Sequence, residues 1–300
     1  EISLGLVGSE MCIRDSTWWF LLRGRNYGIL RWLGYEQTGN CRGIHARDVY
    51  IDLMTMALFL GFICFRRMVP EMTFQISASG AEKFANAMFF WSTWHAEQLP
   101  PDDYWFSGHA LHYYYWGHFH WSWITRIGFI PADLSINLAF ARMVTLIWEA
   151  CWLLAHSLKV RNSWSCIGAF AICWGGNPHA MADLFKTFQS PSQFSWIHYP
   201  FWGPSRAISD IVDEFPAFSA ILGDFHAHHL ALPWFIAWLA VTTAGYRWLI
   251  HGKLLGVERI YPLLLLFATW VGLGLAACLS NMWNLPLVLF VLLLFLLVQF

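Results

Sequence analysis

The sequence is short of charge, since only 12% of its 300 residues are Asp, Glu, Lys or Arg, against about 25% in an average soluble domain. The formal net charge is −1, so no basic surface for nucleic acid is expected. Seven cysteines occur without a CxxC pair, so neither a disulfide framework nor a zinc site is expected. No internal repeat or low-complexity stretch is visible. These absences argue against a soluble, a nucleic-acid-binding and a disulfide-stapled protein.

Apolar and aromatic residues are abundant instead. Hydrophobic residues make up 57% of the chain, with 20 Trp and 25 Phe, and a helix needs about 20 apolar residues to cross a bilayer. We therefore predict an all-α, polytopic bundle of transmembrane helices. The expected segments are 49–66, 134–157, a short one at 163–176, 228–250, 261–279 and 284–300.

Both ends of the chain look truncated, and we expect a fragment. Residues 1–16, EISLGLVGSEMCIRDS, resemble the translation of a sequencing-adapter read-through, so we interpret them as an artefact and exclude them from the fold. Residues 17–48 carry five arginines and are predicted to be a cytoplasmic or interfacial lead-in. Residues 49–300 are predicted to form one transmembrane domain.

The positive-inside rule sets the expected topology. With the lead-in inside, Lys159 and Arg161 also lie inside if only one of the segments 112–130 and 134–157 spans. We predict that 112–130 is a juxtamembrane helix, because it carries three His and an Arg. Loops 67–111 and 177–223 then face outward together. The pair Arg66-Arg67 mildly favours the alternative, in which the two loops lie on opposite faces.

Four titratable side chains, Asp224, His226, His228 and His229, stand where the segment 228–250 begins. One interpretation is a metal half-site at Asp224 and His226, since carboxylate and imidazole both bind divalent ions; another is a base with phosphate-binding donors. The alternative is a polar helix entry, with Asp224 as the cap and the histidines at headgroup level. Polar groups at membrane depth are costly, which favours a functional site.

Two more candidate acids, Asp103 and Glu71, stand in the first outward loop. Asp103 follows Asp102 in an aromatic stretch at 100–121, and such a carboxylate can accept a proton from a hydroxyl or bind a metal. The aromatic residues suit sugars and isoprenoids, or they lie at the bilayer interface as in other membrane proteins. Glu71 falls just past the segment 49–66, where it faces a catalytic cavity or is a solvated flank.

Charged residues also occur in the second loop and inside a predicted span. Arg206, in the run 205–216, has the planar fork that suits phosphate, and Glu214 follows it. The alternative for this run is a solvated loop. Arg142 and Glu149 are two helical turns apart on one face, so they line a cavity or satisfy polar neighbours within the bundle.

Four stretches resemble the bacterial and archaeal YYY membrane proteins, the family DUF2298. They are PPDDYW, LHYYYWGHF (111–119), DEFPAFSAILGDFHAHHLALP (213–233) and NMWNLP (281–286). The resemblance runs from about Pro70 to Pro286. In layout the family is similar to the GT-C membrane glycosyltransferases, which use polyprenyl-phosphate sugars, so the resemblance implies a GT-C-like fold.

The individual positions of the family pattern are matched at some places and replaced at others. Asp103 and Trp105 match its Pro-Pro-x-Asp-Pro-Trp, with Tyr104 in place of the last Pro. The other matches are the triple Tyr at Tyr113, Tyr114 and Tyr115, the Ser-Arg at Ser205 and Arg206, the Glu of Glu-Phe-Pro at Glu214, and the Asp-Leu-His-Pro-His residues Asp224, His226 and His228. Departures are His112 for Asn, Ala227 for Pro and Asn284 for Asp.

The resemblance implies sugar transfer from a polyprenyl-phosphate donor on the extracytoplasmic face of a multi-pass protein, in the plasma membrane of a bacterium or archaeon. The expected partners are this donor and the lipid bilayer. The resemblance implies no definite cofactor, and a divalent metal ion bound by Asp224 and His226 stays open as the alternative to direct phosphate binding. The implied catalytic residues are Asp103, Glu71 and Glu214; the implied metal ligands are Asp224 and His226; and the implied substrate-binding residues are Arg206, His226, His228, Tyr113, Tyr114, Tyr115 and Trp105.

Two other classes of function stay open. One is a transporter or flippase for a lipid-linked or anionic substrate, which predicts charges at mid-membrane and an inverted repeat. Arg142 and Glu149 agree with this class, and the missing repeat does not. The other is a non-catalytic assembly protein, in which the Asp-His stretch is an interfacial girdle.

Overall fold

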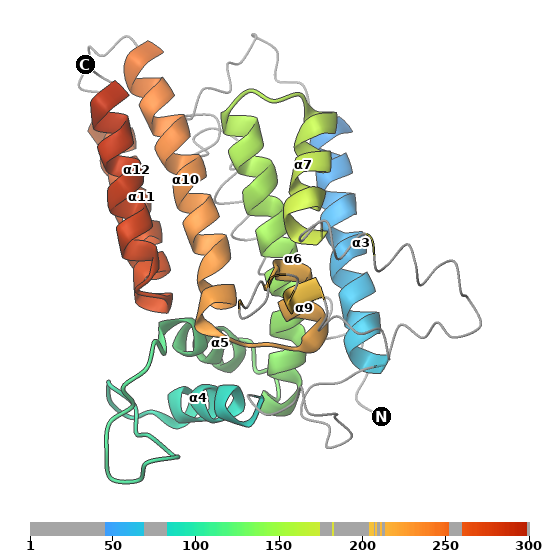
Figure 1. Cartoon of the computed structure of the whole chain (residues 1–300), viewed down its shortest axis with the longest axis vertical. Helices are drawn as coiled ribbons and strands as arrows, with labels where there is room; N and C mark the ends of the chain where they lie inside the picture. The colour runs from blue at the N-terminus through green and yellow to red at the C-terminus, as the bar shows by residue number, and fades with distance from the viewer. Residues whose placement is uncertain are drawn as a thin grey trace.

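Apolar residues with good helix propensity fill the predicted segments, and each segment is helical over the residues that the structure describes. The computed structural model describes residues 46–68, 83–174, 182, 204–206, 208, 211, 214–251 and 260–298. Within these ranges the fold is all-α, and the one β-type contact is a single bridge between Asp102 and Ala110. The prediction of an all-helical bundle is therefore confirmed (Figure 1).

The helices keep close to their predicted bounds. They are α3 (Ala46–Met68), α4 (Lys83–His95), α5 (Trp116–Ile127), α6 (Ala132–Ser157), α7 (Asn162–Trp174), α9 (Pro216–Leu222), α10 (Ala227–His251), α11 (Ile260–Ser280) and α12 (Asn284–Val298), with a 3-10 turn at Pro204–Arg206. By length and composition, two stretches could cross a membrane: Leu134–Ser157 of α6 and Leu263–Ser280 of α11. Helix α12 is also apolar but shorter.

Helix α6 lies at the centre of the bundle in contact with α3, α7 and α10, and α11 and α12 run roughly alongside α10 (Figure 1). Its fully buried side chains, such as Phe140, Ile147 and Trp148, form the centre of the core. Helices α11 and α12 turn large apolar side chains outward, among them Leu264, Phe267 and Leu296. This outer surface suits contact with lipid better than contact with water.

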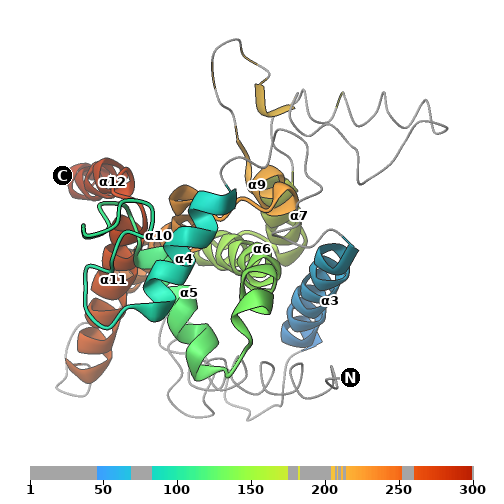
Figure 2. The same ribbon diagram turned by 90° about the horizontal axis from the view of Figure 1, so that it is seen from below.

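Helices α4 and α5 lie across one end of this bundle (Figures 1 and 2). We call it the α4–α5 end; α3 ends there, and α6 and α10 begin there. Gly117 of α5 lets the two backbones approach, since a Cβ at this position would lie 2.7 Å from the Cβ of Leu230 in α10. The lack of a side chain at Gly117 therefore fixes α5 against the first turn of α10.

The prediction that segment 112–130 does not span agrees with the structure. Helix α5 has 12 residues, about 18 Å of helix, whereas the hydrocarbon core of a bilayer is about 30 Å thick. The loop predicted at 67–111 is less irregular than expected, because α4 forms within it. Residues 1–45 and most of the loop 177–223 lie outside the described residues.

Candidate functional site

The second motif-rich stretch folds as helix, tight turn and helix. Pro216 begins α9, a position that suits proline, since it lacks an N–H. Gly223 ends the helix in the left-handed conformation, with φ of 76°. The Asp224 N–H then donates to the Ser219 carbonyl at 2.8 Å. This reversal brings Glu214, which precedes α9, back beside the start of α10.

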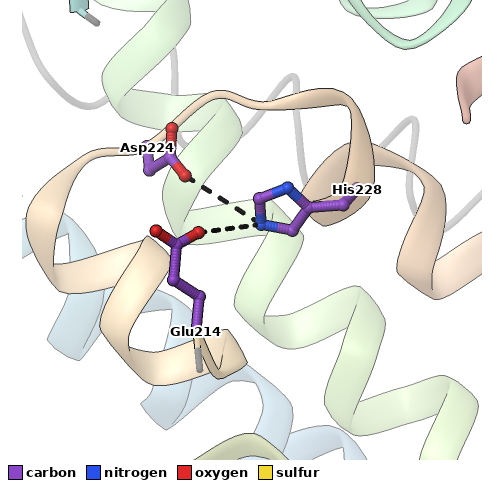
Figure 3. A group of neighbouring side chains, drawn as sticks. All are labelled: Glu214, Asp224 and His228. Atoms are coloured by element: carbon purple, nitrogen blue, oxygen red, sulfur yellow. Dashed lines mark ion pairs between the residues drawn. The ribbon is translucent and has the colours of Figure 1, made fainter. Parts of the chain in front are cut away.

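Three side chains converge at this reversal, which lies towards the α4–α5 end of the bundle (Figure 3). His228 Nε2 lies 3.5 Å from Glu214 Oε2 and 4.0 Å from Asp224 Oδ2. One ligand atom from each of the three residues lies within 4.8 Å of the other two. Arg206 joins the group, with Nη2 3.9 Å from Glu214 Oε1. We call Glu214, Asp224 and His228 the acid–His cluster.

The Asp224 carboxylate is the most buried member, with a side chain that is 8% exposed. Its Oδ1 accepts a hydrogen bond from Asn86 Nδ2 at 3.2 Å and contacts His226 Nδ1. Burial alone would raise the pKa of Asp224, but the hydrogen bond and charge of His226 outweigh it, and the pKa is lowered. Asp224 is therefore a carboxylate near neutral pH, with Oδ2 turned towards His228.

Two buried histidines hold the backbone beneath the cluster. His118 Nε2 donates to the Phe225 carbonyl at 2.9 Å, and His229 Nδ1 donates to the Asp224 carbonyl at 3.2 Å. Burial lowers the pKa of His118 to about 3, so this ring is neutral near pH 7. Both histidines were visible in the sequence as polar residues, but nothing in their spacing indicated that they fix residues 224 and 225.

Arg66 and Asn86 also reach the site, and neither of their roles was predicted from the sequence. Arg66, only 3% exposed at the end of α3, donates to the Ile221 carbonyl in α9. Its guanidinium lies 4.7 Å from the ring of Phe65 and 5.6 Å from that of Phe140. The one available signal for Arg66 was a cation in the last turn of an apolar helix. Asn86 had none, because α4 was not expected.

The side chain of Asp103 forms hydrogen bonds within its own turn. Its Oδ1 accepts the N–H groups of Trp105 at 2.8 Å and Phe106 at 3.0 Å, and its N–H donates to the His109 carbonyl at 2.9 Å. Trp105 is 67% exposed. Both overall views place the loop between α4 and α5 towards α11 and α12, whereas α9 lies towards α7 (Figures 1 and 2). The structure therefore does not bring Asp103 and Trp105 to the acid–His cluster.

The first residue of the triple tyrosine, Tyr113, packs against α4. The Tyr113 ring stacks on Phe89 of α4, with centroids 4.3 Å apart and planes at 8°. Phe89 also meets the edge of His118, the residue that holds Phe225. Tyr114 and Tyr115 are half-buried. These contacts connect the YYY stretch to the site through α4.

The charged pair inside α6 is satisfied within its own helix. The two guanidinium nitrogens of Arg142 lie 3.2 and 3.3 Å from the two carboxylate oxygens of Glu149, and Arg142 also donates to Thr145 Oγ1 at 3.0 Å. Of the two interpretations from sequence, the structure supports the pairing of polar neighbours. Glu71, the remaining candidate, lies outside the described residues.

The acid–His cluster offers two kinds of chemistry. Carboxylate and imidazole groups are ligands for divalent cations, and the Arg206 guanidinium with the imidazoles supplies donors for a phosphate. Asp224, His226, His228, Glu214 and Arg206 were all candidates from sequence, and the structure brings these five together.

Comparison with curated proteins and with solved structures finds no match for this chain. The family model described as uncharacterized membrane protein (DUF2298) matches residues 18–300. This match agrees with the YYY resemblance and with the apolar spans, and it identifies no reaction. The chain belongs to the DUF2298 family of membrane proteins.

Proposed function

We propose that this protein is a membrane glycosyltransferase that transfers a sugar from a polyprenyl-phosphate donor at the extracytoplasmic surface. One observation carries the proposal. Glu214, Asp224 and His228, with Arg206 beside them, converge towards one end of an apolar helix bundle. The phosphate of a lipid-linked donor lies at such a depth, where the hydrocarbon core ends.

The distribution of cations supports an extracytoplasmic site in a multi-pass protein. Lys159 and Arg161 follow α6 at the end opposite the α4–α5 end, and Arg247 lies near them, donating to the Ser157 carbonyl at 2.8 Å. By the positive-inside rule that end faces the cytoplasm. Of the pair Arg66-Arg67, Arg66 no longer argues against this topology, because it is buried against α9 instead of lying in a loop, whereas Arg67 is exposed and still favours the alternative. We assign the protein to the plasma membrane of a bacterium or archaeon.

The donor phosphate is held by the guanidinium of Arg206 and by the imidazoles of His226 and His228. Arg206 is permanently charged, and its fork suits phosphate oxygens. The rings of His226 and His228 stack with centroids 5.6 Å apart, so two imidazole donors lie side by side for the phosphate. Charge develops on the leaving phosphate as the bond to the sugar breaks, and fixed donors stabilise it there.

The acceptor hydroxyl needs a base, and Glu71 is the better of the two candidates. The contact between Arg66 and Ile221 anchors the end of α3 beside α9. Glu71 follows Met68 by three residues, a chain length that reaches at most about 11 Å. The loop between α4 and α5, to which Asp103 belongs, lies towards α11 and α12 in both views, away from α9 (Figures 1 and 2). We therefore propose Glu71 as the base. Asp103 stabilises its own loop by accepting backbone hydrogen bonds.

A second candidate function is transport of a lipid-linked or anionic substrate. The observation that favours it is the pair Arg142–Glu149 in the middle of α6, because ionised groups within a span often mark a substrate path. A transporter would need this pair and would tolerate substitution of the cluster. A glycosyltransferase would show the reverse dependence.

Sugar transfer in membranes that contain the full-length protein tests the proposal. The donor is radiolabelled polyprenyl-phosphate sugar, supplied as a panel of sugars, and the variants are Glu214→Gln and His228→Ala. The matched control is Glu97→Gln, an exposed acid outside the cluster. We expect both cluster variants to lose at least about 100-fold in transfer rate and the control to keep it. Absence of transfer by the wild type across the panel would overturn the proposal in favour of transport or assembly.

A further inference from the structure

We infer that Glu214, Asp224 and His228 bind one divalent transition-metal cation, Mn²⁺ or Zn²⁺, through a carboxylate oxygen of Glu214, Oδ2 of Asp224 and Nε2 of His228. The cation-binding inference stands on the geometry of these three side chains. Its role, which is to hold the donor phosphate between the two carboxylates, rests on the proposed function.

The separations fit ligands around a shared ion. Ligand atoms bound to one cation at about 2.0–2.2 Å lie about 3 to 4 Å from one another. His228 Nε2 lies 3.5 Å from Glu214 and 4.0 Å from Asp224, and the three atoms fall within 4.8 Å of each other. These separations exceed those of direct hydrogen bonds, about 2.7–3.2 Å. Small rotations of the carboxylates complete a three-ligand face (Figure 3).

Asn86 provides an independent observation at the same place. Its side chain is 3% exposed, and its Nδ2 donates to Asp224 Oδ1 at 3.2 Å. Its Oδ1 is buried and has no hydrogen-bond partner within the part of the chain that the structure describes. Because both atoms belong to one amide group, this oxygen lies beside the Asp224 carboxylate. A buried oxygen without a donor is costly, and a cation or its bound water supplies what it lacks.

In each carboxylate the two oxygens face different partners. Asp224 Oδ1 is held by Asn86 and His226, which leaves Oδ2 towards His228. Glu214 Oε1 lies 3.9 Å from Arg206, and Oε2 lies towards His228. His226 therefore orients Asp224, as a neighbour of a metal ligand usually does. This assignment differs from the pair predicted from sequence, Asp224 and His226.

The chemistry of the ligand set selects the class of cation. Mg²⁺ and Ca²⁺ prefer sites made of oxygen alone, whereas an imidazole ligand favours transition metals, and carboxylates suit Mn²⁺ in particular. A phosphate beside two carboxylates would be repelled, and Arg206 offsets only one of the two negative charges. A divalent cation removes that repulsion and leaves coordination positions for phosphate oxygens.

Metal binding by the purified full-length protein tests the inference without any donor. Protein in detergent is stripped with chelator, and equilibrium dialysis against Mn²⁺ or Zn²⁺ gives the stoichiometry and dissociation constant. We expect one saturable site in the wild type and in Glu97→Gln. Glu214→Gln and His228→Ala should weaken it by at least about 100-fold, and His226→Ala by only about tenfold. Thermal unfolding of the metal-free variants checks that they stay folded.

Three results would overturn the inference. These are no saturable binding by the wild type, equal binding by Glu214→Gln and Glu97→Gln, or a loss in His226→Ala larger than that in His228→Ala. Because no donor is present, a negative result leaves the transfer experiment intact. Sugar transfer that persists in excess chelator would mean a glycosyltransferase without a metal, and a metal site without transfer would refute only the proposed function.

Discussion

The two motif-rich stretches of this chain, residues 100–121 and 213–233, have similar compositions and very different structures. Both combine acids, histidines and aromatic residues next to apolar helices. In the first, Asp103 accepts backbone N–H groups of its own turn. In the second, Glu214 and Asp224 are brought within reach of His228 by the reversal between α9 and α10. A stretch that is rich in acids, histidines and aromatic residues is therefore not by itself a place where side chains converge.

The difference arises from the contacts that hold each stretch in place. The loop that follows α4 is held by backbone hydrogen bonds across its own base, such as that from the Leu111 N–H to the Pro101 carbonyl at 2.8 Å. The reversal after α9 is held from three other helices, by Arg66 of α3, Asn86 of α4 and His118 of α5. Contacts from several helices fix side-chain positions tightly, which a functional site needs.

The same substitution in both stretches gives the largest expected difference. Asp224→Asn removes one of the two negative charges of the cluster but keeps the shape of the side chain, and we expect at least about a 100-fold loss of sugar transfer. Asp103→Asn can still accept the turn hydrogen bonds, so we expect transfer within about threefold of the wild type. Initial rates in membranes with matched expression measure both. An equal loss in the two variants would show that the two stretches form one active site.

The supporting arginines give the next largest difference. Arg66→Met removes a buried guanidinium that joins α3 to α9, and we expect the free energy of unfolding to fall by about 2 kcal/mol. Arg126→Met is the matched change at an exposed position, where the guanidinium donates to the Trp94 carbonyl at 3.2 Å. Arg126→Met should lower the free energy of unfolding by less than Arg66→Met does. Thermal unfolding in detergent provides the comparison, and a larger effect of Arg126→Met would contradict it.

A pH effect on stability follows from His118. Burial lowers its pKa from 6.5 to about 3, so the unfolded chain takes up this proton below about pH 6.5 while the folded chain does not. Stability is therefore lost as the pH falls from 6.5 towards 3, by up to about 1.4 kcal/mol per pH unit. His118→Gln removes the titrating group.

We expect the Tm of His118→Gln to fall less than that of the wild type between pH 7 and pH 5. His109→Gln, a change at an exposed histidine in the first stretch, should fall as the wild type does. Equal pH slopes for all three proteins would contradict the buried, neutral state of His118.

The smallest effect is expected at Trp105. This side chain is 67% exposed, so Trp105→Ala should change the free energy of unfolding by no more than about 0.5 kcal/mol. The matched buried residue is Trp148, which is 2% exposed, and Trp148→Ala should cost about 3 to 5 kcal/mol. A large loss of stability in Trp105→Ala would show that the loop packs against another part of the protein.

Most of the helical fold could be predicted from the sequence because long apolar runs leave few alternatives. The bounds expected for 134–157 and 228–250 fall within two residues of α6 and α10. Helix α4 was missed because Lys83–His95 mixes small polar and aromatic residues and lacks the length of a span. The outcome for Arg142 and Glu149 also needed the structure, since two turns on one face permit either a pair or a cavity lining.

Composition and local pattern determined by themselves that this chain forms an all-helical membrane bundle, that it belongs to the DUF2298 family, and which side chains were candidates for chemistry. These properties depend on near neighbours in the sequence, since apolar length sets a helix and a motif is read residue by residue. Only the tertiary structure decided that Glu214, Asp224 and His228 meet, that Asn86 and Arg66 support them, and that Asp103 does not join them. Such meetings depend on how distant helices pack, and the sequence spacing of 138 residues between Asn86 and Asp224 carries no signal of their contact.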